Sequence, residues 1–230
     1  MKVEFVTPKP NLAKTIDQWL TPAFPTWFKE IKVPIEEAIR ENHKTVRHCP
    51  AFVHLFKNSH LLRAPQDMSL FRNEDGRIAT REPNAREQFF SGEFNFEFQM
   101  GKQWSKYDSI KFDVRGSLIP EESTTCLFFD PIYHEDEKTT LTAMTGVWPM
   151  HPELYSHIGI NMLGNRQCFD DAGFLHIFKG TPLAYLYWPQ GKPTIATKVV
   201  SEEEYERDYG YVHNNFVGDF IKKEKDIVGQ

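Results

Sequence analysis

Apolar and polar residues alternate without interruption in the stretch Phe94-Asn95-Phe96-Glu97-Phe98-Gln99-Met100. Successive side chains of a β-strand point to opposite faces, so one face of this stretch is entirely apolar and the other entirely polar. The stretch therefore predicts a half-buried strand, and it makes a mainly β fold the starting hypothesis.

The same pattern with a period of two continues on both sides of this stretch, from Val46 to Val200. Turn-forming runs such as Asn73-Glu74-Asp75-Gly76 separate the apolar segments. Short strands without helices between them favour antiparallel pairing, so we expect an antiparallel β-sandwich or a jelly-roll or β-clip-like core. The further predicted strands are Met68 to Phe71, Ile110 to Val114, Thr125 to Phe129, Thr140 to Trp148, Ile158 to Met162, Phe174 to Phe178, Leu183 to Trp188 and Ile195 to Val200.

The N-terminal part of the chain has a different pattern. Residues 15 to 44 are predicted to be helical in pieces, because Pro22 and Pro25 interrupt the first run. A second run begins at Pro34, a residue that suits the first turn of a helix. Its apolar residues recur at helical spacing, which predicts an amphipathic helix that ends before Thr45.

The C-terminal part also returns to helix. Ser201 and Glu204 have the spacing of a capping box, which marks a helix start. We therefore predict an N-terminal helical segment (1–45), a β domain (46–200) and a C-terminal helix (201–230) packed on the β domain. Docking of the helix on another subunit is the alternative. Its apolar stripe consists of Tyr205, Tyr209, Val212, Phe216 and Phe220.

The charge balance limits the classes of partner. Lys and Arg number 27 and Asp and Glu number 32, so the net charge is −5 and gives no global attraction to nucleic acid or to an anionic membrane. The N-terminus has no apolar leader segment, which favours a soluble protein made in the cytosol. Cys49, Cys126 and Cys168 show no CxxC spacing, so we expect unpaired thiols.

Two stretches carry a resemblance to a known family. The first runs from Thr45 through Cys49-Pro50 to the apolar segment Leu61-Leu62-Arg63-Ala64-Pro65-Gln66-Asp67-Met68. The second is Ile177-Phe178-Lys179-Gly180-Thr181-Pro182-Leu183-Ala184-Tyr185-Leu186-Tyr187-Trp188-Pro189, which looks like a closing hairpin. Together they resemble an uncharacterised family of tailed phages, including marine phages and cyanophages.

The resemblance implies a phage-encoded protein in the host cytoplasm or in the virion. We expect a non-enzymatic binding or assembly role, with other phage proteins, host proteins or further copies of the chain as partners. No membrane partner is expected, and nucleic acid is not favoured as a partner.

The closing stretch is also similar to the last strand pair of dUTPase-like β-clip proteins. Those enzymes need an Asp after a Gly-apolar pair, and the matching place here is Thr145-Gly146-Val147-Trp148-Pro149, with Trp148 at the position of the acid. A nucleotide hydrolase that lacks the usual acid is therefore one alternative function.

The sharpest chemical pattern is His134-Glu135-Asp136, an HxD sequence of the kind that begins the iron site of non-haem Fe(II) oxygenases. The distal ligand would be His176 or His213, with Arg166 or Lys179 as the anchor of a 2-oxo acid. An Fe(II)- and 2-oxo acid-dependent oxygenase is thus a second alternative. The charged run from His134 to Lys138 favours an exposed loop instead, so we expect no metal and no cofactor.

Other catalytic motifs are missing from the sequence. It contains no GxSxG elbow, no P-loop and no GxGxxG motif, so no catalytic residue is assigned. One basic and aromatic cluster has the composition of a site for a nucleic-acid strand, but nearby Glu82 and Glu87 favour a solvated loop. The cluster consists of Arg77, Arg81, Arg86, Lys102, Trp104, Lys106, Tyr107 and Lys111.

Overall fold

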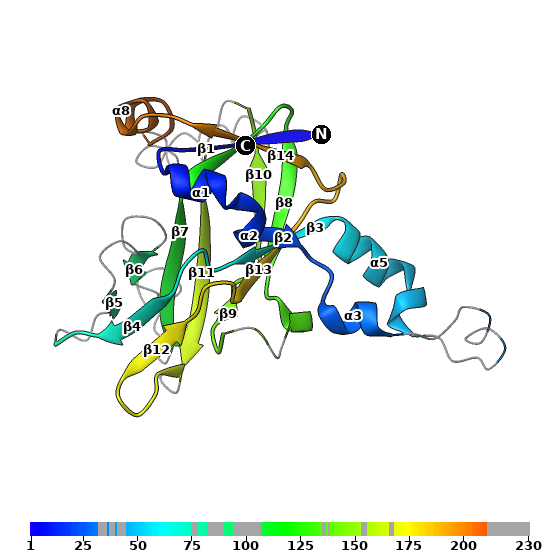
Figure 1. The fold of residues 1–230 in the computed structure, drawn as a ribbon, viewed down its shortest axis with the longest axis horizontal. Helices are drawn as coiled ribbons and strands as arrows, with labels where there is room; N and C mark the ends of the chain where they lie inside the picture. The colour runs from blue at the N-terminus through cyan, green and yellow to red at the C-terminus, as the bar shows by residue number, and fades with distance from the viewer. Residues whose placement is uncertain are drawn as a thin grey trace, which may run out of the picture.

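Two large β-sheets and a smaller third sheet form the body of the protein (Figure 1). The computed structural model describes residues 1–31, 36, 40, 45–74, 78–81, 90–93, 107–134, 137, 139–152, 156–165 and 168–210. Within these ranges the largest sheet has six strands, in the order β14-β1-β7-β11-β9 with β6 added to β7. They are β1 (Lys2–Thr7), β6 (Phe90–Glu93), β7 (Tyr107–Pro120), β9 (Thr142–Ala143), β11 (Ser156–Asn165) and β14 (Thr194–Val199).

The second sheet has five described strands, in the order β10-β8-β13-β3-β2, and the third has three, in the order β12-β4-β5. The second sheet contains β2 (Leu20–Pro22), β3 (Ser59–Arg63), β8 (Thr124–Phe129), β10 (Gly146–Met150) and β13 (Pro182–Tyr187). The third contains β4 (Met68–Arg72), β5 (Ile78–Thr80) and β12 (Phe174–Ile177). Among the described strands only β1 and β14 pair in parallel.

The main core lies between the two large sheets. Apolar side chains of alternating residues on β7 and β11, among them Phe112 and Ile160, face Phe128 on β8 and Leu186 on β13 in one buried cluster. The central strand β7 spans 14 residues and pairs with β11 along most of its length. The predicted mainly β, sandwich-like fold is therefore confirmed.

Most of the predicted strands are present. The predictions at Met68, Ile110, Thr125, Ile158, Phe174, Leu183 and Ile195 correspond to β4, β7, β8, β11, β12, β13 and β14. The segment from Thr140 to Trp148, predicted as one strand, contains two strands, β9 and β10. Residues 144 and 145 lie between them and belong to neither strand. The alternating stretch from Phe94 to Met100 lies outside the described residues.

The N-terminal part differs from the prediction of a helical segment over residues 1–45. Short helices are present, but β1 and β2 are strands of the two large sheets. Most of the helix predicted after Pro34 lies outside the described residues. The helices in the first third of the chain are α1 (Pro10–Lys14), α2 (Ile16–Trp19), α3 (Thr26–Glu30), the short 3₁₀ helix η1 (Val46–His48) and α5 (Pro50–Lys57).

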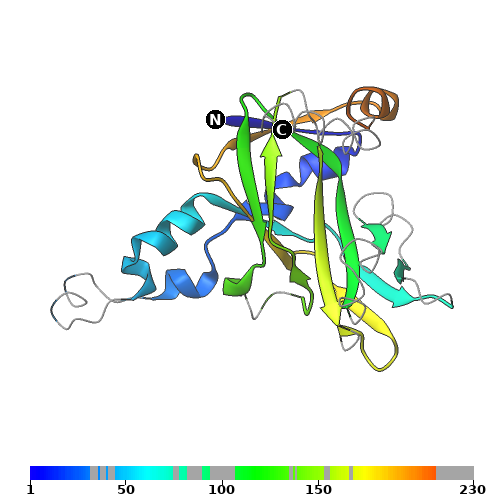
Figure 2. The ribbon, with the colours of Figure 1, turned by 180° about the vertical axis from the view of Figure 1, so that it is seen from behind.

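Helix α5 replaces the extended structure that the sequence predicts after Val46. Pro50 occupies its first turn, where the missing N–H group costs nothing. Phe52, Leu55 and Phe56 recur at helical spacing and pack with Phe28 of α3 on Tyr185 of the second sheet. Figures 1 and 2 show α3 and α5 side by side, extending from one side of the sheets.

Strand β13 is buried on both faces. Ala184, Leu186 and Trp188 belong to the main core, and Tyr185 belongs to the aromatic cluster with α3 and α5. Helices α3 and α5 cover the face of the strand that carries Tyr185.

Helix α8 (Glu202–Tyr205) packs elsewhere on the β structure. The Ser201 side chain accepts a hydrogen bond from the Glu204 backbone N (3.0 Å), so the predicted helix start is correct. Tyr205 is buried against Val6 of β1 and Val200, on the six-stranded sheet. A π-helical turn, η5 (Glu206–Gly210), follows, and residues 211–230 lie outside the described part.

The predicted closing hairpin is a corner between two sheets. β12 and β13 are consecutive but do not pair with each other: β12 pairs with β4 and β13 pairs with β3, all antiparallel. The Thr181 backbone N donates to Phe178 O (3.0 Å), and the Lys179 backbone N donates to Asp67 Oδ1 (2.6 Å). The two stretches that carry the phage-family resemblance are thus pairing partners.

Gly180 in this corner provides the first prediction. Its φ of 88° lies in the left-handed region, and its N–H donates to Ala64 O (2.8 Å). We expect Gly180→Val to lower the free energy of unfolding by about 1 kcal/mol or more, because valine is strained at positive φ. Urea unfolding measures this. Gly146→Val on β10 is the control, since a Cβ there has open space. Equal losses of stability in both variants would show that the positive φ of Gly180 is not the cause.

Candidate functional site

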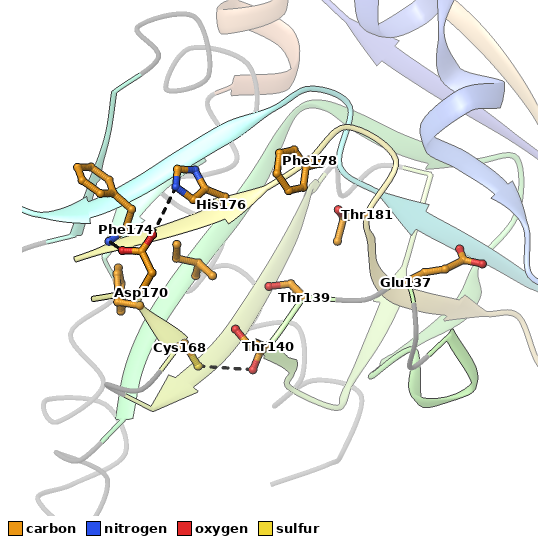
Figure 3. A pocket seen from close by; sticks show the side chains of 11 residues that line it. Glu137, Thr139, Thr140, Cys168, Asp170, Phe174, His176, Phe178 and Thr181 are labelled. Atoms are coloured by element: carbon orange, nitrogen blue, oxygen red, sulfur yellow. Dashed lines mark hydrogen bonds and ion pairs between the residues drawn. The ribbon is translucent and has the colours of Figure 1, made fainter. Parts of the chain in front are cut away.

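An open pocket of about 410 Å³ lies beside β12 (Figure 3). Three parts of the chain form it: the connection after the 3₁₀ helix η3 (Ile132–His134), the connection between β11 and β12, and β12 with the following corner. The residues that line it are Glu137, Thr139, Thr140, Cys168, Phe169, Asp170, Phe174, Leu175, His176, Phe178 and Thr181.

Asp170 organises the connection between β11 and β12. Its Oδ1 accepts hydrogen bonds from the backbone N of Ala172 (3.0 Å) and of Phe174 (2.8 Å), and its own backbone N donates to Phe174 O (2.7 Å). Aspartate often stabilises a turn in this way. One carboxylate oxygen is therefore used by the loop, and the other faces His176.

His176 lies between a carboxylate and a hydroxyl. Its Nε2 is 3.6 Å from Asp170 Oδ2, and its Nδ1 is 3.2 Å from Ser69 Oγ on the neighbouring strand β4. Ser69 and His176 face each other directly in the β4–β12 register. The two contacts orient the imidazole, and they line up a hydroxyl, a base and a carboxylate. About half of the His176 and Asp170 side-chain surface is exposed, so solvent screens their attraction.

Aromatic rings form a row along the exposed face of β12. Phe174 and His176 stack with ring centroids 5.9 Å apart and 25° between planes, and His176 and Phe178 stack at 6.5 Å and 19°. Residues two apart on a strand share a face, which explains the row. Phe178 at its end is 66% exposed. An exposed ring at the end of a stack can take one more ring on its free face.

The charged residues that line the pocket are both acidic. They are Glu137 and Asp170, and no Lys or Arg is among the described residues that line it, although Arg81 lies over the Phe174 ring. Arg63, which lies nearby, donates from Nη1 to Glu137 Oε2 (3.1 Å) and to Gly180 O (2.7 Å), and so ties Glu137 to the corner. Carboxylates and threonine hydroxyls favour a neutral or cationic ligand over a phosphate.

Cys168 lines the pocket as a thiol. Its Sγ donates to Thr140 O (3.5 Å), as the dashed line in Figure 3 shows. None of the three cysteines forms a disulfide. Burial raises the pKa of Cys126, which keeps that thiol protonated.

The structure separates the candidate iron ligands that it describes. His134 is buried on η3, not in an exposed loop, and its Nε2 contacts Ala23 O (3.3 Å). His176 lies on β12 and lines the pocket beside it. Asp136, His213 and Arg166 lie outside the described residues. Among those described, no group of three His, Cys, Asp or Glu side chains is placed to hold a metal ion.

Trp148 occupies the place where a dUTPase-like hydrolase carries its acid. It lies on β10, which pairs with β8, and its ring stacks on Phe128 with centroids 5.3 Å apart. The side chain thus contributes to packing at one edge of the five-stranded sheet.

Part of the basic and aromatic cluster can be placed. Lys111 Nζ pairs with Asp113 Oδ2 (2.9 Å), and the Arg81 guanidinium lies over the Phe174 ring at 4.1 Å from its centroid. Arg77, Arg86, Lys102, Trp104 and Lys106 lie outside the described residues. Arg81 therefore adds a cation to one end of the ring row, and Lys111 is neutralised by its neighbour.

Comparisons with known proteins give no family. No protein-family model matches the chain, and no curated protein is detectably similar to it in sequence. None of the described helices is long and apolar enough to cross a membrane.

Of Ser69, Asp170 and His176, only His176 is a candidate site residue from the sequence, and there it is a candidate iron ligand. Ser69 is 107 residues away from His176, and the pairing of β4 with β12 brings the two together. Asp170 lies in a turn, where its Oδ1 accepts two backbone hydrogen bonds. The spacing Phe174, His176, Phe178 was the one local signal that an aromatic face was present.

Proposed function

We propose that the protein is a non-enzymatic binding protein and that the pocket beside β12 takes a neutral ring that carries hydroxyl groups, as in a saccharide. The observation that carries the proposal is the exposed Phe178 ring at the end of the stack, with hydrogen-bonding groups around it. The sequence also led to the hypothesis of a phage-encoded protein with a virion or assembly role. Ligand binding is compatible with that role, because neither requires a catalytic group.

The chemistry of the lining supports this ligand class. The C–H face of a sugar ring packs on an aromatic ring, whose face carries partial negative charge. Sugar hydroxyls donate to carboxylates such as Asp170 and Glu137 and exchange hydrogen bonds with Thr139, Thr140 and Thr181. Nucleotides fit less well, because their phosphates would meet the two carboxylates.

An array of neutral glycans, followed by titration of the best binder, tests the proposal. We expect Phe178→Ala to weaken binding by about tenfold, or about 1.4 kcal/mol, because the stacking surface is lost. Val147→Ala removes an exposed apolar side chain on β10 and is the matched control. Absence of binding by the native protein, or equal affinity in Phe178→Ala, would refute the proposal.

The Ser69–His176–Asp170 line favours a second candidate, hydrolysis of an ester. Ser69 Oγ would attack the carbonyl carbon while its proton passes to His176 Nδ1, the leaving alkoxide would take that proton, and water would release the acid by the reverse steps. Labelling with a fluorophosphonate probe tests this function. Labelling at Ser69 that is lost in His176→Gln would favour hydrolysis; an unlabelled Ser69 would leave the binding role.

A further inference from the structure

A second cleft, of about 340 Å³, lies between α3 and η3. Its walls include the aromatic side chains of Trp27 and Tyr133 and the carboxylates of Glu30 and Glu137, with His134 also in the lining. Glu137 lines this cleft and the pocket beside β12. The lining of the two sites differs, because this cleft has the buried His134 and no row of stacked rings is among the described residues that line it.

His134 presents an unused hydrogen-bond acceptor. Its side chain is only 2% exposed, and its Nε2 lies 3.3 Å from the Ala23 carbonyl, so Nε2 carries the proton and donates. Burial lowers the pKa of His134 and favours the neutral ring. The neutral ring then has its lone pair on Nδ1, and this buried atom has no hydrogen-bond partner among the described residues.

The nearest charged group to that lone pair is also an acceptor. Glu137 Oε2 lies 3.7 Å from His134 Nδ1, a distance too long for a hydrogen bond. Arg63 Nη1 donates to the same carboxylate oxygen, at 3.1 Å. Two acceptors therefore face each other across a short gap, and a group with several N–H donors would satisfy both. Buried polar atoms in proteins almost always have such a partner.

The aromatic wall suits a positive charge. Trp27 Nε1 donates to Tyr133 O (2.7 Å), which fixes the indole ring beside η3. Cations are attracted to the faces of Trp and Tyr rings. Glu30 adds a second carboxylate, and no Lys or Arg is among the described residues that line the cleft. The lining residues therefore favour a cation over an anion, and Arg63 offsets part of the charge of Glu137.

We propose that this cleft binds a primary ammonium group, whose N–H donors bond His134 Nδ1 and Glu137 while its charge lies against Trp27 and Tyr133. A primary ammonium has three donors, so it can serve both acceptors at once. A quaternary ammonium has the charge but no donor. The lysine side chain and a free alkylamine share the chemistry that this cleft recognises.

Calorimetric titration of the full chain tests the proposal with four probes that each carry a four-carbon chain. n-Butylammonium represents a free amine, Nα-acetyl-lysine N-methylamide represents a lysine side chain, and butyltrimethylammonium and 1-butanol lack the donors or the charge. We expect the primary ammonium probes to bind about tenfold or more tightly than the other two, the value of one charge-assisted hydrogen bond. Tighter binding of the lysine derivative than of butylammonium would identify a peptide as the source.

Variants locate the binding. Glu30→Gln and Glu137→Gln are each expected to weaken n-butylammonium binding several-fold, whereas Glu122→Gln makes the same charge change at an exposed position outside the cleft and should have no effect. Equal binding of butyltrimethylammonium, or native affinity in either Glu30→Gln or Glu137→Gln, would overturn the proposal. Phe178→Ala is expected to leave this binding unchanged, so the test is independent of the saccharide proposal.

Discussion

Acidification from pH 7 to pH 4 is expected to remove about 3 kcal/mol of stability through one residue, His60. His60 is buried on β3, and its Nδ1 accepts a hydrogen bond from Trp188 Nε1 (3.1 Å). Burial, with a smaller contribution from Lys192, lowers the pKa of His60 from 6.5 to about 4. In the folded protein the His60 ring is therefore neutral, and the lone pair on Nδ1 accepts the hydrogen bond from Trp188.

The direction of the pH effect follows from this shift. Between pH 6.5 and pH 4 the unfolded chain binds a proton at His60 and the folded chain does not, so stability falls as the pH falls. The contribution is complete above pH 6.5. His134 adds to the loss in the same direction, because burial lowers its pKa too.

Urea unfolding at several pH values between 7.5 and 4 measures the effect. His60→Gln keeps an acceptor for Trp188 and removes the titration, so the slope of stability against pH should decrease by about 1.4 kcal/mol per unit within this window. His54→Gln, at an exposed histidine on α5, is the matched control. An unchanged slope in His60→Gln would show that His60 does not carry the acid sensitivity.

Two kinds of strand could be predicted from sequence. β8 alternates buried and half-buried residues along its whole length, and so does most of β4, whereas β13 is buried on both faces but consists of a run of apolar residues. β3 has neither signal, because four consecutive residues are buried and two of them, Ser59 and His60, are polar. β1 is short and precedes two prolines, so its local pattern was too weak to distinguish it from the helices that follow.

Strand pairing between residues far apart in the sequence determines features that local sequence patterns do not predict. The corner at Gly180 has the sequence of a hairpin turn, but β3 and β4 supply the partners of β13 and β12 from more than 100 residues away. The same pairing places Ser69 against His176. His134 lies in a charged run, yet the packing of η3 on Ala23 and Tyr185 buries it. Both candidate ligand sites therefore depend on tertiary contacts that no local sequence pattern indicates.

Phe56→Ala is the second change with a large expected effect, a loss of about 3–5 kcal/mol in the free energy of unfolding. Phe56 is fully buried on α5, at the centre of the aromatic cluster that joins α3 and α5 to β13. Five rings surround it with centroid distances of 5.3 to 6.2 Å, those of Phe24, Phe28, Phe52, Tyr133 and Tyr185. Truncation leaves a cavity that these rings cannot fill without moving the helices.

Urea unfolding with tryptophan fluorescence measures this loss. Phe178→Ala makes the same chemical change at an exposed ring, where a change in the free energy of unfolding within about 0.5 kcal/mol is expected.

The cluster also holds Phe28 of α3 against Tyr133 of η3 through Phe56, and these two elements form the walls of the ammonium cleft. Phe56→Ala should therefore abolish n-butylammonium binding while folded protein is still present. A loss of stability no larger than that of Phe178→Ala would mean that α3 and α5 are held to the sheet by other contacts.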